Sequence, residues 1–478
     1  MEKYPLEDNL LGFVGQPNLW WETGLYWSVL SDYVHLTNDT SIVSKADIAA
    51  GLTSQRGNNS DFLPSEHLKG IGNDDQSYWA LAALTAAEYE LVDKPEEWAD
   101  VAENVWNLQA ARWDTAACDG GLRWQIFSFN NGYDFKNAGT NMNFLLLSAR
   151  LAKHTGNTTY VDWATKIYEW SNSTGLISSE MGDGPPGPGE QNTYYGVYDG
   201  LMTGDNCSHV SKLMWSPNAA TAAYAAALLA SVNSTYAEDL AALEANPNNA
   251  TLAEETAANQ IDYSVPQSKS QWQLWYWRES AILYNLVSNF AWSSDNTSNP
   301  EDNEVTGILN EHACESVGTC NVDQKVFKGI TSSYLWKMSQ LDRIIGKALI
   351  DGPLIASAKA AAASCTDEGA CGFTWTEKKF DNDTGVGQQL AALEVIISLI
   401  GANSTAPKGY NGYFNENGAT VNGEVCEDCS NATGLGDSGP DATSSGGAVT
   451  QTGAASFFGS ASAGWGIGAI ALGVAALL

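Results

Sequence analysis

Apolar side chains recur every three to four residues along most of the chain, a spacing that places them on one face of a helix. The clearest runs are residues 20–37, 74–90, 96–113, 141–155, 158–174, 216–232, 273–291, 323–341, 353–365 and 387–400. The strict alternation that indicates β-strands is scarce. The pattern therefore predicts an all-α protein.

These helices are too numerous for a small bundle, and substantial loops join them, so we expect a toroid or a solenoid of antiparallel helices. No internal repeat has the period of a known solenoid, which favours the closed toroid. The toroid would occupy residues 15–405. An N-terminal segment, 1–14, precedes it, and a polar linker, 406–447, and a terminal segment, 448–478, follow it.

Two adjacent aspartates stand at the start of the second helical run, in the sequence GNDDQ (72–76). Asn73 is a favourable N-cap, Gln76 follows three residues later as in a capping box, and acidic residues in a first turn complement the helix dipole. Asp74 and Asp75 are therefore explained by helix physics alone. The alternative is a pair of catalytic carboxylates, which lie about 5 Å apart in retaining glycosidases.

Composition narrows the classes of function. The 478 residues include 56 acidic and 23 basic side chains, for a net charge of −33. This charge repels phosphate, and no cluster of Lys and Arg offsets it, so nucleic-acid binding is disfavoured. The chain also has 18 tryptophans. Their rings stack on the apolar faces of sugars, which favours carbohydrate binding, although core packing explains many of them equally well.

Cysteines and glycosylation sequons indicate an oxidising compartment. Short spacing favours disulfides Cys314–Cys320, Cys365–Cys371 and Cys426–Cys429, which leaves Cys118 to pair with Cys207. A metal or redox role for the C-x-x-C in the polar tail is the alternative, but no second such pair and no nearby histidine completes a zinc site. Sequons for N-glycosylation occur at Asn38, Asn58, Asn157, Asn172, Asn206, Asn233, Asn249, Asn296, Asn382, Asn403 and Asn431.

The C-terminal residues have the pattern of a GPI-attachment signal. Small residues occur at Ser444, Ser445, Gly446 and Gly447, with attachment expected at Ser445 or Gly446, and a polar spacer and an apolar run follow. A transmembrane helix and a core helix are the alternatives. The apolar run is short and rich in glycine for a membrane span, and no Lys or Arg follows Lys408, while a core helix does not usually follow a long polar linker. We expect a protein that is secreted and GPI-anchored at the plasma membrane or cell wall. Because residues 1–13 do not have the pattern of a signal peptide, secretion would require that a leader has been removed.

Four stretches, in order, resemble the fungal members of glycoside hydrolase family 76. They are GNDDQSYWALAALTAAEYE (72–90), RWDTAACDGGLRWQIFSFNNGYDFKN (112–137), NFLLLSARLAKHTGNTTYVDWATKIYEW (143–170) and GVGQQLAALEV (385–395). The family holds endo-α-1,6-mannanases and the GPI-anchored Dfg5/Dcw1 cell-wall proteins. The resemblance implies an (α/α)6 barrel and a retaining mechanism, with Asp74 as nucleophile and Asp75 as general acid/base. We expect no cofactor.

The resemblance also implies substrate-binding positions, at Trp79, Arg123, Trp124, Lys136, Asn137, Asn141, Asp199 and Asn218. Core packing explains Trp79 equally well, Arg123 and Lys136 are alternatively residues that hold their loop, and Asn141 and Asn218 are alternatively helix caps. The chain departs from the family pattern in a Pro/Gly-rich insertion, 181–192, and in the stretch 246–310.

The resemblance implies two enzymatic functions, and the helix-cap explanation of the aspartates leaves a third, non-catalytic one. The first is transfer of the GPI-core glycan of wall proteins to wall polysaccharide, with α-1,6-linked mannose in the donor and wall glucan as acceptor. The second is hydrolysis of α-1,6-mannan by the same aspartates. The third is a non-catalytic mannan-binding wall glycoprotein, whose aspartates only cap a helix. We expect a monomer that contacts the membrane through a GPI lipid only.

Overall fold

The computed structural model describes residues 14–15, 17–178, 195–231, 271–291, 307–341, 345–402 and 404. Its α-helices are α1 (Trp20–Thr37), α2 (Lys45–Gln55), α3 (Asn73–Glu88), α4 (Pro95–Ala111), α5 (Ala138–Thr155), α6 (Thr158–Ser173), α7 (Ser216–Ala230), α10 (Gln271–Phe290), α11 (Phe327–Ser339), α12 (Ile345–Ala363) and α13 (Val386–Gly401). A short 3₁₀-helix, η4 (Asp323–Val326), runs directly into α11. The predicted helical runs are thus present, and α2 is a helix that the apolar spacing missed.

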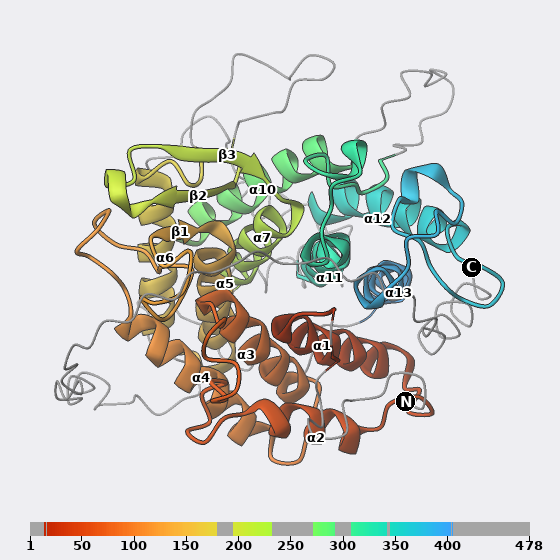
Figure 1. Cartoon of the computed structure of the whole chain (residues 1–478), viewed down its shortest axis with the longest axis horizontal. Helices are drawn as coiled ribbons and strands as arrows, with labels where there is room; N and C mark the ends of the chain where they lie inside the picture. The colour runs from red at the N-terminus through yellow and green to blue at the C-terminus, as the bar shows by residue number, and fades with distance from the viewer. Residues whose placement is uncertain are drawn as a thin grey trace, which may run out of the picture.

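Six of the described helices close a ring. Helix α1 packs on α3, α3 on α5, α5 on α7, α7 on α11, α11 on α13, and α13 on α1 again. Helices α2, α4, α6, α10 and α12 pack outside this ring, each against one or two of its members (Figure 1). The fold is an (α/α) barrel, as predicted.

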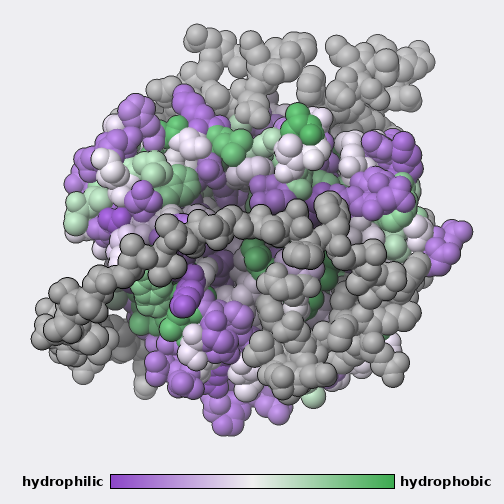
Figure 2. All heavy atoms as spheres, viewed as in Figure 1, coloured by the Kyte–Doolittle hydropathy of each residue, from purple (hydrophilic) through white to green (hydrophobic). Residues whose placement is uncertain are grey.

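Burial explains which helices form the ring. Every residue of α7, whose sequence is SPNAATAAYAAALLA, is buried, and α3, α5 and α13 are buried on nearly all sides. Helices α4 and α6 bury one face only, which is typical of an outer layer. The described surface in Figure 2 is accordingly mostly hydrophilic, with smaller hydrophobic areas between.

A three-stranded antiparallel sheet lies beside the ring and was not predicted. Its strands are β1 (Phe135–Asn137), β2 (Tyr198–Met202) and β3 (Val210–Met214), in the order β1-β2-β3. Strand β1 has three residues, too few for alternation to be recognised in the sequence. It ends where α5 begins, and β3 is followed by Trp215 and then by α7. The sheet therefore fixes the approach of the chain to the N-termini of two ring helices.

Three disulfides are present: Cys118–Cys207, Cys314–Cys320 and Cys365–Cys371. They confirm three of the predicted pairs, and Cys426–Cys429 lies outside the described residues. So do the predicted linker, the terminal segment with its attachment positions, and the sequons at Asn233, Asn249, Asn296, Asn403 and Asn431. Of the described sequons, Asn38, Asn58, Asn206 and Asn382 are exposed, whereas Asn157 and Asn172 are partly buried. Within the described ranges, no helix combines the length and apolar character needed to cross a membrane.

Candidate active site

A cavity of about 850 Å³ opens at one end of the barrel. It is lined by Leu19, Trp20, Trp21, Glu66, His67, Gly70, Ile71, Asp74, Asp75, Tyr78, Trp124, Gln125, Phe135, Asn137, Gly139, Asp199, Trp215, Pro217, Asn218, Asp323, Gln324 and Phe327. Many of these residues lie at or beside the first turns of α1, α3, α5, α7 and η4–α11. The N-termini of these ring helices thus meet at the cavity.

This convergence suits the charges of the cavity. Five of its lining residues are carboxylates, and none of the residues that line it is Lys or Arg. Free backbone N–H groups and the positive ends of helix dipoles favour negative charge near helix N-termini. The backbone N–H groups at these helix N-termini therefore provide positive electrostatic potential in a cavity whose lining contains no Lys or Arg.

The start of α3 holds the two adjacent aspartates in place. Helix α3 begins after Gly72, not after Asn73, and Asp75 Oδ2 accepts the backbone N–H of Gly72 at 2.6 Å. The predicted capping arrangement is therefore shifted by one residue. Gln76 instead donates to the carbonyl of Asp61 at 2.6 Å. A Cβ atom at position 72 would lie 2.3 Å from Asp74 Oδ1, so only glycine leaves room for this carboxylate.

Asp74 is held from two sides. Its Oδ1 accepts a hydrogen bond from the backbone N–H of Asp75 at 3.0 Å, and its Oδ2 accepts one from Nδ2 of Asn137 at 3.2 Å. Asn137 is the N-cap of α5 and accepts the N–H of Thr140 at 3.2 Å, which orients its amide group. Gly139 lies beside Asp74 Oδ2, where a Cβ atom would be 3.5 Å away. The lack of a side chain at Gly139 keeps the cavity open at this oxygen.

The two carboxyl groups differ in proton affinity. Burial raises the pKa of Asp74 from 3.8 to about 6, against the lowering effect of its hydrogen bonds with Asn137 and backbone N–H groups. Burial raises the pKa of Asp75 well above its ordinary value, and the negative charge of Asp74 raises it further. Near neutral pH, Asp74 is therefore mainly ionised beside a protonated Asp75. A retaining glycosidase requires this combination of one ionised carboxylate, the nucleophile, and one protonated carboxyl group, the general acid.

The structure brings half of the predicted substrate-binding residues to the cavity. Trp124, Asn137, Asp199 and Asn218 all line it. Asp199, on β2, accepts the indole N–H of Trp215 at 3.1 Å, and burial raises the pKa of Asp199. These residues enclose the aspartate pair with polar groups and aromatic faces.

The other half lie outside the cavity lining. Trp79 is fully buried, its ring stacks on Trp20 at 5.2 Å, and its Nε1 donates to the carbonyl of Trp20 at 3.2 Å. Trp79 is therefore a core residue, and its neighbour Tyr78 lines the cavity in its place. Asn141 is also fully buried, where it accepts the N–H of Leu122 and donates to the Leu122 carbonyl. It is not a helix cap, because it joins the loop before β1 to α5.

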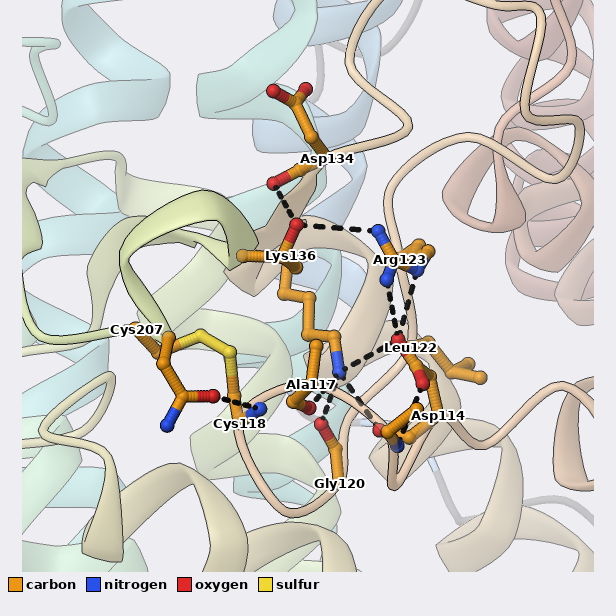
Figure 3. Close-up of polar contacts among 12 residues, drawn as sticks. Asp114, Ala117, Cys118, Gly120, Leu122, Arg123, Asp134, Lys136 and Cys207 are labelled. Atoms are coloured by element: carbon orange, nitrogen blue, oxygen red, sulfur yellow. Dashed lines mark hydrogen bonds and ion pairs between the residues drawn. A yellow bond between two sulfur atoms is a disulfide. The ribbon is translucent and has the colours of Figure 1, made fainter.

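Lys136 and Arg123 hold the loop before β1, as Figure 3 shows. Lys136 is fully buried and donates to the carbonyls of Asp114, Ala117 and Gly120 at 2.9, 2.7 and 2.6 Å. Arg123 pairs with the Asp114 carboxylate at 2.8 Å. Successive strand residues point to opposite sides. Lys136 therefore turns into the loop, while its neighbours on β1 line the cavity.

Several lining residues were not predicted from the sequence, among them Trp20, Trp21, Tyr78, Trp215 and Asp323. Four of them lie at or next to the first turn of a ring helix, and Asp323 opens η4. The sequence already places these residues near predicted helix starts. This placement indicates a binding site only when the helix N-termini are known to meet at one cavity.

A ring of helices whose acidic, aromatic cavity contains two unequal carboxyl groups defines a carbohydrate-active enzyme of the glycosidase type. The model of glycosyl hydrolase family 76 matches residues 4–258 and 270–411. The mannan endo-1,6-alpha-mannosidase DCW1 of Saccharomyces cerevisiae is 33% identical over 424 residues, which cover 87% of this chain and 78% of that protein. The mannan endo-1,6-alpha-mannosidase DFG5 of the same yeast is 30% identical over 423 residues, covering 87% and 77%.

A solved structure agrees with these relatives. The crystal structure of Dfg5 from Chaetomium thermophilum in complex with glucosamine is 28% identical, covers 88% of this chain and 90% of that chain, and superposes with a TM-score of 0.66. The chain belongs to glycosyl hydrolase family 76.

Proposed function

We propose that the protein is a retaining glycosidase that acts on α-1,6-linked mannose. The observation that carries this proposal is the pair Asp74 and Asp75, adjacent at one helix start but with different proton affinities. In the first step Asp74 attacks the anomeric carbon while Asp75 gives its proton to the departing glycosidic oxygen. The product of this step is a glycosyl ester of Asp74.

In the second step Asp75, now ionised, takes a proton from the attacking hydroxyl group, whose oxygen bonds to the anomeric carbon and releases Asp74. Two inversions leave the configuration of the sugar unchanged. The attacking hydroxyl belongs to water in hydrolysis and to a second sugar in transglycosylation.

The relatives DCW1 and DFG5 are both mannan endo-1,6-alpha-mannosidases, which supports mannose as the donor sugar. The glucosamine in the Chaetomium Dfg5 complex supports a donor that also contains this amino sugar, as a GPI core does. We therefore propose the GPI-core glycan of wall proteins as donor and wall glucan as acceptor. Simple hydrolysis of α-1,6-mannan is the second candidate, because the same two aspartates perform it.

Product analysis separates these functions. The protein is incubated with an α-1,6-mannobiosyl donor, with and without a glucan oligosaccharide, and the products are followed by NMR of the anomeric protons. We expect the α-configuration in the first product and a mannobiosyl–glucan conjugate when glucan is present. Free mannobiose without conjugate would favour the hydrolase. Binding without any cleavage would favour a mannan-binding glycoprotein and overturn the enzymatic proposal.

We further propose that the protein is secreted and held at the plasma membrane or wall by a GPI lipid. The polar and apolar pattern of residues 444–478 supports this, as do three disulfides and exposed sequons in the described part of the chain. The test is treatment of intact cells with phosphatidylinositol-specific phospholipase C, which should release the protein. If the lipase releases a control GPI protein from the same cells but leaves this protein behind, anchoring by a GPI lipid is contradicted.

Activity should depend on pH in a way set by Asp74. Because its pKa is about 6, kcat/KM should fall tenfold per pH unit well below pH 6, as Asp74 takes up a proton and ceases to be a nucleophile. A second decline at higher pH should follow the ionisation of Asp75. The rate is measured from pH 3 to 9, with circular dichroism at each pH as a control for folding. An acid limb centred near pH 4 would contradict the raised pKa.

A further inference from the structure

Asp323 is one of the five carboxylates that line the cavity, and it comes from a distant part of the chain. It is the first residue of η4, and Gln324 and Phe327, which follow it, line the same cavity. The start of this turn is fixed from both sides: Asn321 N–H donates to Gln324 Oε1 at 2.8 Å, and Gln324 N–H donates to Asn321 Oδ1 at 3.2 Å. The backbone that carries Asp323 is therefore well anchored.

Among the described residues, one oxygen of this carboxylate has a hydrogen-bond partner. Oδ1 accepts the indole N–H of Trp21 at 3.0 Å, and within the described part of the chain we find no other hydrogen bond or ion pair of the Asp323 side chain. Trp21 also lines the cavity, where its ring packs on Tyr78 at 4.7 Å. One carboxylate thus holds an aromatic wall and keeps an oxygen for another donor.

The cations nearest in sequence are engaged elsewhere. Lys325 pairs with Asp383 and lies over the ring of Phe373 at 4.2 Å. Lys328 is fully buried and pairs with Glu315 at 2.8 Å. Asp323 is thus a partly buried carboxylate without a described cation. Such a group is costly unless hydrogen-bond donors reach it, and the hydroxyl groups of a sugar supply these donors.

We propose that Asp323 is a specificity-determining residue, whose carboxylate accepts hydrogen bonds from hydroxyl groups of the mannose unit that packs against the ring of Trp21. This inference rests on the proposed function, because it assigns a role within the same sugar site. The ligand class is a neutral hexose with adjacent hydroxyl groups, from which one carboxylate can accept two hydrogen bonds.

The charge of Asp323 also reaches the aspartate pair. It raises the pKa of both Asp74 and Asp75, in addition to the effect of burial. The other titratable groups facing this region from the surrounding elements are Glu22 on α1, Glu66 and His67 before α3, Tyr78 on α3, and Asp199 on β2. None of these is a permanent cation, so nothing in this set cancels the Asp323 charge. Removing that charge should shift both limbs of the pH–rate profile to lower pH.

The test is Asp323→Asn, with Asp383→Asn as the matched control. Asparagine keeps an acceptor for Trp21 but removes the charge, and it offers sugar hydroxyls a poorer acceptor. Asp383→Asn removes a carboxylate that holds the same short helix through Lys325 but does not line the cavity. We expect Asp323→Asn to raise KM for an α-1,6-mannobiosyl donor about 10- to 100-fold, the value of a charge-assisted hydrogen bond. Its kcat should change less, and its pH profile should move to lower pH, while the control keeps the wild-type KM and profile.

The outcomes separate a binding role from a structural one. Wild-type KM and pH profile in Asp323→Asn would show that Asp323 only holds Trp21, and would overturn the inference. A lower unfolding temperature with an unmoved pH profile would do the same. If the wild-type protein cleaves no α-1,6-mannoside, the proposed function fails, and the ligand assigned to Asp323 fails with it. An active wild type beside an unaffected Asp323→Asn overturns the Asp323 inference alone.

Discussion

Asp74→Asn and Asp75→Asn should each reduce kcat on an α-1,6-mannoside by at least about 10³-fold, because each removes a group that takes part in bond breaking. Sugar binding should remain, since the amide has the size of the carboxyl group it replaces. Turnover is measured with a mannobiosyl donor and binding by calorimetry with α-1,6-mannobiose.

The Asp74→Asn variant should be at least as stable as the wild type. The folded pKa of Asp74, about 6, lies above its ordinary value of 3.8, so the stability that its protonated form provides is complete below pH 4 and is lost as the pH rises through 6. At neutral pH the ionised group therefore destabilises the fold, and a neutral amide removes that cost. Thermal unfolding at pH 7 and at pH 4 checks this: the gain of Asp74→Asn should be present at pH 7 and absent at pH 4.

Asp47→Asn is a matched control for the helix-cap explanation. Asp47 lies at the third position of α2 and accepts the N–H of Ser44 at 2.9 Å, just as Asp75 accepts the N–H of Gly72 in α3. If the aspartate pair only capped a helix, Asp75→Asn and Asp47→Asn would both cost at most about 1 kcal/mol of stability and no activity. Full activity in Asp75→Asn would therefore contradict the catalytic assignment.

The two roles within the pair can also be told apart. An aryl mannoside with a good leaving group needs no protonation, so Asp75→Ala should retain formation of the glycosyl ester from it. Asp74→Ala should remain inactive with this substrate, because the nucleophile is missing. A reversed pattern would exchange the two assignments.

Removing the Cys118–Cys207 disulfide should produce the largest loss of stability among the three described disulfides. Its cysteines are 89 residues apart, and the chain-entropy model gives about 4.5 kcal/mol for a loop of that length. The Cys314–Cys320 bridge closes a separation of 6 residues, for which the same model gives about 2 kcal/mol. Denaturant unfolding of the two Cys→Ser double variants measures the difference, and equal losses would contradict the loop-length explanation.

Activity should fall with this disulfide as well. Cys118 lies in the loop that Lys136 holds by three carbonyls (Figure 3). Strand β1 continues from Lys136 to Asn137, which donates to Asp74. The bridge fastens this loop to the connection between β2 and β3. Loosening it should lower kcat at temperatures well below unfolding, whereas the Cys314–Cys320 variant should keep its activity.

The sequence does not reveal which of two adjacent aromatic residues on α3, Tyr78 or Trp79, faces the cavity. Tyr78 and Trp79 are both large aromatics one turn beyond the aspartates, and their side chains point about 100° apart on the helix. Only the rotation of α3 within the ring decides that Tyr78 lines the cavity and Trp79 enters the core. The same holds on β1, where Lys136 and Asn137 point to opposite sides and only Asn137 reaches Asp74.

Asp323 shows a second limit. In the sequence it is one acidic residue among polar ones before a helix, and nothing local separates it from Asp47 or any other first-turn aspartate. Asp323 reaches the cavity because η4 begins at the same mouth of the barrel as α3, so that residues remote in sequence share one cavity. A single sequence contains no distance between such residues.

By itself the sequence determined the helical class, most helix positions, three disulfide pairs and the aspartate pair, because each depends on spacing within a few residues or on short, recognisable motifs. The tertiary structure decided which of the candidate residues face the cavity, how strongly burial raises the pKa of each carboxyl group of the pair, and that Asp323 lines the same cavity. These properties depend on burial and on the field of groups brought together by the closed ring, and neither is encoded in local spacing.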